Sequence, residues 1–166
     1  MKLLLLLLPF YLFATNYQDL RSEEAVKCLQ LNLYHEARGS NLADQAAVAD
    51  VVLNRVESSR FPNTVCEVVK QARLSKWWKI QHNKDVPIKN KCQFSWYCDG
   101  RSDDMLDTEA ATKAYYIAYQ ILHFEVYKGI TEGATHYFAT YINPPRWSKK
   151  MQYMGQIGSH KYYKTH

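Results

Sequence analysis

The sequence lacks several patterns that would point to a particular class of protein. Its 166 residues contain no internal repeat, no low-complexity run and no linker, so one domain with a sizeable core is expected. None of its four cysteines is spaced as C-x₂-C, and the His35-Glu36 pair lacks the second histidine of an H-E-x-x-H motif. These absences argue against a zinc knuckle and a zinc peptidase, so no metal and no cofactor is expected.

The excess of one charge is also small. The chain has 21 Lys and Arg against 16 Asp and Glu, a formal net charge of +5. This excess suits an anionic polymer without identifying one, and it is too modest to favour nucleic-acid binding. Aromatic residues are abundant by contrast, at 14% of the chain, and they provide flat apolar surface for a ligand groove.

The apolar run at the N-terminus is too short to span a bilayer comfortably. Lys2 is followed by apolar residues 3–13, interrupted only by Pro9, which is typical of a secretory signal. Cleavage after Ala14 would place Leu12 at the −3 position, where a small residue is usual. Residues 1–14 are therefore expected to be a signal or a weak membrane anchor. Residues 15–166 are expected to form a monomeric domain exported to the periplasm or the cell exterior.

The four cysteines fit an oxidising compartment. They are Cys28, Cys66, Cys92 and Cys98, and they allow three pairings. Cys92 and Cys98 are close enough in sequence to close a small loop. This favours a Cys92–Cys98 disulfide, which leaves Cys28 to pair with Cys66.

One carboxylic acid continues the apolar stripe of a predicted helix over residues 22–38. The residues at i−3, i−7 and i−11 from Glu36 are Leu33, Leu29 and Ala25. Gly39 stands where the helix should end, which puts Glu36 in the last turn. Burial and the negative end of the helix dipole would both favour the protonated carboxyl there, as a general acid requires. A surface Glu36 paired with Arg38 would fit the same pattern.

The remaining pattern predicts a mainly helical α+β fold. A second helix is expected over residues 42–57, with Asp44 as its cap, and a third from Asn63 or Thr64 to Leu74. Residues 75–100 read as an irregular or short-stranded lobe, with a turn at Asp99-Gly100. A long helix is expected over residues 107–127, and loops with a small hairpin over 129–166.

Four blocks of sequence, in register, resemble the SleB-like cell wall hydrolase family, which includes spore cortex-lytic enzymes and phage endolysins. The blocks are Glu36-Ala37-Arg38-Gly39 with residues 45–56, Phe61-Pro62 with residues 65–69, residues 92–100, and residues 133–137 with 145–147 and 157–160. The chain departs from the family pattern at Ser40, where an acidic residue is common, and at Asp50, where Asn is usual. It departs again at Phe138-Ala139, where a second histidine is common.

The resemblance implies a lysozyme-like fold with a small β element and a loop-rich C-terminal part. It further implies that residues 15–166 form one catalytic domain that acts on the glycan strands of peptidoglycan, with Glu36 as the catalytic acid. Glycosidic cleavage ordinarily uses two carboxylates. Asp44, Asp50 and Asp99 are candidates for the second, but no neighbouring residue distinguishes any of them.

One acid is sufficient when the substrate supplies the nucleophile. The 6-hydroxyl of N-acetylmuramic acid can close on its own anomeric carbon, so we expect a lytic transglycosylase that cleaves the bond between N-acetylmuramic acid and N-acetylglucosamine. Hydrolysis of the same bond by a muramidase mechanism is the alternative. A zinc-dependent wall amidase or peptidase and a non-catalytic wall-binding module are the other hypotheses.

The candidate substrate-binding residues are polar and aromatic. Gln93 and Ser95 could form hydrogen bonds with sugar hydroxyls or N-acetyl groups. Alternatively, they could form only a local turn bridged by the cysteines. The aromatic candidates are Trp96, Tyr137 and Trp147, which could stack on sugar rings or belong to the core. The resemblance implies that His136, beside Tyr137, lines the cleft near Glu36, whereas the residues alone would also fit a structural histidine. Basic residues beside Trp77 and Trp78 could meet an anionic wall or form a solvated face.

Overall fold

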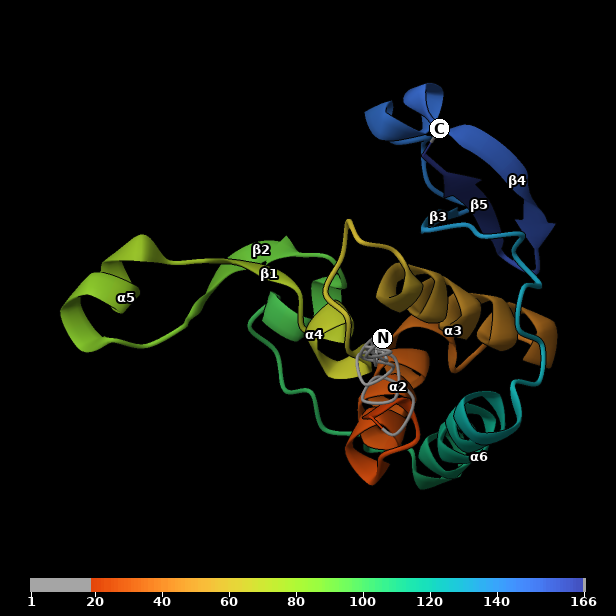
Figure 1. The fold of residues 1–166 in the computed structure, drawn as a ribbon, viewed down its shortest axis with the longest axis horizontal. Helices are drawn as coiled ribbons and strands as arrows, with labels where there is room; N and C mark the ends of the chain where they lie inside the picture. The colour runs from red at the N-terminus through yellow and green to blue at the C-terminus, as the bar shows by residue number, and fades with distance from the viewer. Residues whose placement is uncertain (1–18, 166) are drawn as a thin grey trace, which may run out of the picture.

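The structure is a computed structural model that describes residues 19–165, so the expectation for residues 1–14 lies outside the described part. Helices α2 (Glu23–Ala37), α3 (Leu42–Glu57), α4 (Val65–Val69) and α6 (Thr108–Phe124) pack together in the body of the molecule (Figure 1). Their inward faces form the main core, which includes Leu29, Leu33, Val48, Val52 and Ala118. Among the described helices, none is long and apolar enough to cross a membrane.

Side-chain caps fix where α2 and α3 begin. Ser22 Oγ accepts from Ala25 N at 3.1 Å, and Asn41 Oδ1 accepts from Asp44 N at 2.9 Å. The prediction that Asp44 caps α3 is therefore wrong, because Asn41 supplies the cap and the Asp44 side chain is buried. Helix α2 ends at Ala37, one residue before the predicted end at Arg38, and Glu36 lies in its last turn as predicted.

The segment between α4 and α6 is more regular than predicted. The third helix ends at Val69 rather than Leu74, because Ala72–Leu74 form strand β1, which pairs antiparallel with β2 (Pro87–Cys92). Between these strands lies helix α5 (Lys76–His82), which was not predicted. Figure 1 shows α5 held well away from the helical body by the β1–β2 ribbon. Strand β2 leads into a 3-10 helix, η2 (Ser95–Cys98).

The C-terminal part contains the predicted hairpin and one further strand. Strands β3 (His136–Ala139), β4 (Gln152–Ile157) and β5 (His160–Lys164) form an antiparallel sheet in the order β3-β5-β4. A 3-10 helix, η3 (Arg146–Lys150), lies between β3 and β4, where no helix was expected. Tyr162 and Ala134 pack on Ala47 and Val51 of α3, so the sheet rests against that helix.

Two disulfides join the pairs that the sequence predicted. Cys28–Cys66 links α2 to α4, and Cys92–Cys98 links the end of β2 to the end of η2. With the helices and small sheets described above, the fold belongs to the expected mainly helical α+β class. The second disulfide closes the short loop that contains Gln93 and Ser95.

Candidate active site

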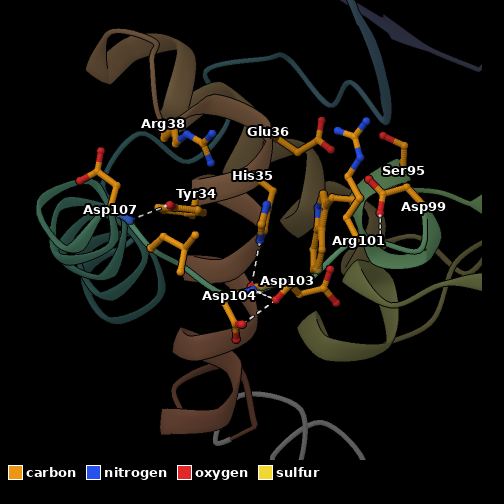
Figure 2. Close-up of a pocket in the computed structure, with 13 residues that line it drawn as sticks. Tyr34, His35, Glu36, Arg38, Ser95, Asp99, Arg101, Asp103, Asp104 and Asp107 are labelled. Atoms are coloured by element: carbon orange, nitrogen blue, oxygen red, sulfur yellow. Dashed lines mark hydrogen bonds between the residues drawn. The ribbon is translucent and has the colours of Figure 1, made fainter.

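Glu36 lies where two cavities meet. It is half-buried in the last turn of α2 and lines both a cavity of about 590 Å³ and one of about 210 Å³. Ser95, at the start of η2, is the other residue shared by the two. Figure 2 shows the larger cavity, with Glu36 and Ser95 toward one end and Asp103 and Asp104 toward the other. The two cavities together make a polar cleft that runs past Glu36.

The smaller cavity brings together residues from five parts of the chain. It is lined by Glu36, Arg55, Gln93, Phe94, Ser95, His136, Tyr137 and Trp147. Five of the six predicted substrate-binding residues are in this set. They come from the segment after β2, from strand β3 and from η3, so only the folded chain places them beside Glu36.

Trp96, the sixth predicted residue, lines the larger cavity but is largely buried. Its Nε1 donates to Asn32 Oδ1 at 3.2 Å, and its ring stacks on His35 with centroids 4.8 Å apart. The His35 ring therefore covers one face of the indole. His35 is itself held by Asp103 O at 3.2 Å, so this stack supports the wall of the cavity.

The surroundings of Glu36 favour its protonated form. Burial raises the pKa of the Glu36 carboxyl. A hydrogen bond from Tyr137 Oη to Glu36 Oε2, 2.9 Å long, lowers it, as do the nearby His160, Arg55 and His35. Burial outweighs these effects, so the pKa of Glu36 lies above its ordinary value. A carboxyl with a raised pKa beside an open cavity can donate a proton to a bound molecule.

Arg55 is a site residue that the sequence analysis missed. Its guanidinium is buried between the rings of Phe61 and Phe94, at 5.3 and 5.1 Å from their centroids. Nε donates to Thr135 O at 2.8 Å, whereas the buried Nη1 has no hydrogen-bond partner among the described residues. An arginine on the apolar stripe of α3, at i+4 from Val51, was the signal available in the sequence.

His136 contributes a neutral ring to the smaller cavity. Burial, followed by the positive charges of Arg55 and Arg60, lowers the pKa of His136 to about 4. Thr135 Oγ1 lies 2.9 Å from His136 Nδ1, and the Trp147 ring lies 5.4 Å away, centroid to centroid. The imidazole is therefore uncharged at neutral pH and can offer a hydrogen bond without attracting an anion.

Asp44 and Asp50, two of the three candidate partner carboxylates, are buried in hydrogen-bond networks. Asp44 accepts from Ser159, His160 and Tyr162, and Asp50 accepts from Gly129 N and Thr131. Both carboxylates fasten the C-terminal part of the chain to α3. Neither lines the two cavities beside Glu36.

Asp99, the third candidate, does line the larger cavity with Glu36. Its Oδ1 accepts from Arg101 N at 2.8 Å, and Gly100 has a φ of +84°, which confirms the predicted turn. Asp103 and Asp104 line the same cavity and were not predicted. Over residues 19–165, no cluster of three or more His, Cys, Asp or Glu side chains is arranged to hold a metal ion.

His160 connects the Asp44 network to the catalytic candidate. His160 Nδ1 lies 2.8 Å from Asp44 Oδ1, and the imidazole meets the Tyr137 ring edge-on with centroids 5.1 Å apart. Tyr137 in turn donates to Glu36. The sheet therefore positions the hydroxyl group that contacts Glu36, and Asp44 anchors the sheet.

The fold and the site define a mainly helical α+β domain with a helix-borne carboxylic acid in a polar cleft. The chain belongs to the Cell Wall Hydrolase family, whose model matches residues 39–163. That range begins after Glu36, so the family model does not include this residue.

One curated protein and two solved structures that are similar to this chain agree with the family assignment. A spore cortex-lytic enzyme of Bacillus cereus is 41% identical over 59 residues, which cover 36% of this chain and 23% of that protein. The catalytic domain of the Bacillus anthracis germination-specific lytic transglycosylase SleB superposes with a TM-score of 0.60 and 27% identity, covering 86% of this chain and 96% of that one. The catalytic domain of Bacillus cereus SleB superposes with a TM-score of 0.54 and 26% identity, covering 86% of this chain and 91% of that one.

Proposed function

We propose that this protein is an exported, monomeric enzyme that cleaves the glycan strands of peptidoglycan as a lytic transglycosylase. The bond broken is the one between N-acetylmuramic acid and N-acetylglucosamine. The observation that carries the proposal is the half-buried Glu36, with its raised pKa, at the junction of two cavities. Family membership and the likeness to a SleB catalytic domain named as a lytic transglycosylase support it.

The reaction needs a single residue to act twice. Glu36 first donates its proton to the glycosidic oxygen as the bond from that oxygen to the anomeric carbon breaks. The resulting Glu36 carboxylate then removes the proton from the 6-hydroxyl of N-acetylmuramic acid while that oxygen bonds the anomeric carbon. The product is a 1,6-anhydro sugar, no water is consumed, and Glu36 ends protonated.

Neighbouring groups support both forms of Glu36. Burial favours the acid before the reaction, while the Tyr137 hydroxyl and the charge of Arg55 stabilise the carboxylate that forms afterwards. Gln93, Ser95 and His136 supply polar contacts for sugar hydroxyl and N-acetyl groups, and Trp147 supplies a ring.

Hydrolysis of the same bond is the second candidate. It is favoured by Asp99, Asp103 and Asp104, which share the larger cavity with Glu36 and could activate water or stabilise the glycosyl cation. The mass of the released muropeptides separates the two reactions. A 1,6-anhydro product is lighter than the hydrolysed product by one water. If the wild type releases products with a reducing end, and the Asp99→Asn variant no longer does, the reaction is hydrolysis.

Replacing Glu36 by Gln tests the catalytic assignment. The variant should lose about 10²- to 10⁴-fold of its activity on purified peptidoglycan, because the proton donor is removed while the shape is kept. Glu24→Gln, at an exposed position on the same helix, should retain activity. Wild-type lysis by Glu36→Gln would overturn the assignment. Loss of wild-type activity in EDTA, with recovery on adding zinc, would favour the amidase or peptidase alternative.

A further inference from the structure

The positive charge of the protein is concentrated in one projecting segment. We define the arm as residues 72–92, which comprise β1, α5 and β2. The arm holds six Lys and Arg and one Asp, a net charge of +5, equal to that of the whole chain. The rest of the sequence, with 15 basic and 15 acidic residues, is neutral. The local excess of positive charge is thus far larger than the composition suggests.

The tip of the arm also exposes large apolar side chains. Helix α5 has no buried residue, and Trp77, Trp78 and Ile80 are 58%, 38% and 76% exposed. Trp77 and Ile80 are three residues apart and share a face, next to the face that carries Lys76 and Lys79. Figure 1 shows that the body of the protein does not cover this helix. Exposed indole and aliphatic groups flanked by lysine are typical of a surface that meets the interface of a lipid bilayer.

We propose that the tip of the arm is a docking surface for an anionic lipid bilayer. Negatively charged headgroups attract the basic side chains of the arm, and the indoles and Ile80 enter the boundary between headgroups and acyl chains. This contact is additional to any made by residues 1–14. It would hold the enzyme at a membrane surface while the cleft remains free to bind glycan.

The geometry favours a bilayer over a polysaccharide as the occupant. A sugar ring needs an open, flat aromatic face, but Trp77 meets Trp78 edge-on at 5.1 Å and His82 packs on Trp78 at 4.7 Å. These rings form a cluster rather than a platform, and Ile80 has no role in stacking on sugars. In the described structure, the two cavities beside Glu36 are also formed without any residue of the arm.

Vesicle co-sedimentation of the full-length protein tests the proposal. Wild type should bind phosphatidylcholine vesicles that contain phosphatidylglycerol at least about tenfold better than pure phosphatidylcholine vesicles, with binding weakened by salt. Lys76→Glu/Lys79→Glu and Trp77→Ala/Ile80→Ala should each reduce this binding about tenfold. Their matched controls are Lys149→Glu/Lys150→Glu on η3 and Tyr141→Ala, also exposed, which should bind as wild type does.

Two readouts make the result decisive. Unchanged circular dichroism and melting temperature show that each arm variant is folded, and residues 1–14 are the same in every variant. Tryptophan emission of the wild type should shift to shorter wavelength on mixing with anionic vesicles. The proposal is overturned if the wild type does not bind, if the arm variants bind as the wild type does, or if they lose binding only to insoluble peptidoglycan.

Discussion

Glu36 and Asp44 are carboxylates on consecutive helices whose pKa values move in opposite directions. Burial alone would raise both pKa values. Asp44 accepts hydrogen bonds from Ser159, His160 and Tyr162, and those from His160 and Ser159 hold the pKa of its carboxyl well below the ordinary value. Glu36 accepts from Tyr137, and there burial prevails. The larger number of fixed donors at Asp44 therefore accounts for the opposite directions of the two pKa shifts.

Position along the helix adds to this difference. Glu36 lies in the last turn of α2, at the negative end of the helix dipole, and Asp44 lies in the first turn of α3, at the positive end. The fully bonded Asp44 is an anion that fastens the sheet to α3. Glu36, with one donor and two adjoining cavities, has a raised pKa and so holds a proton more readily than an ordinary glutamate does. The same chemical group is thus structural in one place and reactive in the other.

The largest effect should come from removing the charge of Asp44. Asp44→Asn leaves donors on Ser159, His160 and Tyr162 without their anion, so unfolding free energy should fall by about 3 kcal/mol in urea titrations. Because the folded pKa of Asp44 is depressed, its stabilisation is complete above the ordinary carboxyl pKa of about 4 and is lost as the pH falls further. The deficit of the variant should therefore shrink below about pH 4.

Asp85→Asn is the control for this substitution. Asp85 is exposed and pairs with Lys79 at 3.1 Å, so its loss should change stability by less than about 0.5 kcal/mol. Equal stabilities of the two variants would show that the Asp44 network does not anchor the sheet.

A pair of glycine substitutions measures how tightly the Asp44 site is packed. A Cβ added at Gly158 would lie 2.6 Å from Asp44 Cβ, whereas one added at Gly129 would have nothing within 4 Å. Both glycines have positive φ, 55° and 81°, so alanine at either costs about 1 kcal/mol of backbone strain. Gly158→Ala should cost about 1–3 kcal/mol more, by thermal unfolding. Equal losses would mean that Asp44 can move aside freely.

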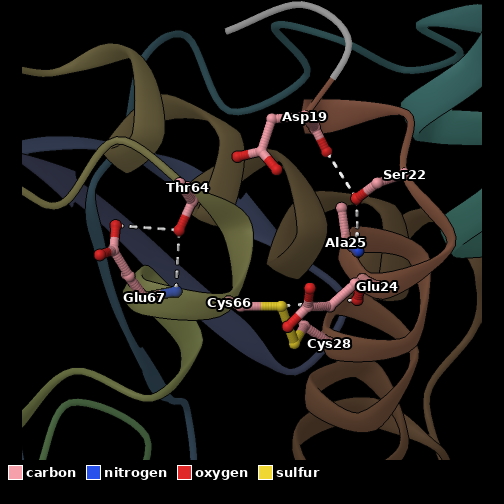
Figure 3. The surroundings of a disulfide bond; sticks show 8 residues. All are labelled: Asp19, Ser22, Glu24, Ala25, Cys28, Thr64, Cys66 and Glu67. Carbon is pink, nitrogen blue, oxygen red and sulfur yellow. Dashed lines mark hydrogen bonds between the residues drawn. A yellow bond between two sulfur atoms is a disulfide. The ribbon is translucent and has the colours of Figure 1, made fainter.

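Features set by local sequence were predicted from it. The stripe of Leu33, Leu29 and Ala25 placed Glu36 in the last turn of α2, since helical periodicity is a local property. The Cys28–Cys66 bond followed from pairing Cys92 with its near neighbour. Figure 3 shows this bond between two capped helix starts, where Ser22 and Thr64 accept from the backbone.

Features set by distant contacts were not predicted. Asp44 resembled a helix cap, but the residues that bind it lie more than 100 positions further along the chain. Arg55 likewise meets Thr135 across 80 positions. Helix α5 was missed for another reason. It has seven residues and none of them is buried, so the segment is too short for a helical pattern to be recognised.

Removing the hydroxyl of Tyr137 should make Glu36 differ still more from Asp44. Because the hydrogen bond from Tyr137 lowers the pKa of Glu36, Tyr137→Phe should raise that pKa further. The fall in rate at high pH, where the acid loses its proton, should then move to higher pH. Rates measured across pH would show this, with the exposed Tyr153→Phe as control. If the fall in rate at high pH did not move, the Tyr137 hydroxyl would not influence the titration of Glu36.

The smallest effect should be a gain in stability. Because the folded pKa of Glu36 is raised, its carboxyl contributes most to the free energy of unfolding below its unfolded pKa of about 4.3. This contribution is lost as the pH rises through the folded pKa. Gln cannot ionise, so Glu36→Gln should unfold at higher denaturant than wild type at pH 7, by less than about 1 kcal/mol. The difference should vanish near pH 4, whereas the Asp44→Asn deficit should be nearly complete there and stay level up to pH 7. A Glu36→Gln protein less stable than wild type at pH 7 would mean that Glu36, like Asp44, is held as an anion, and the contrast between the two sites would be lost.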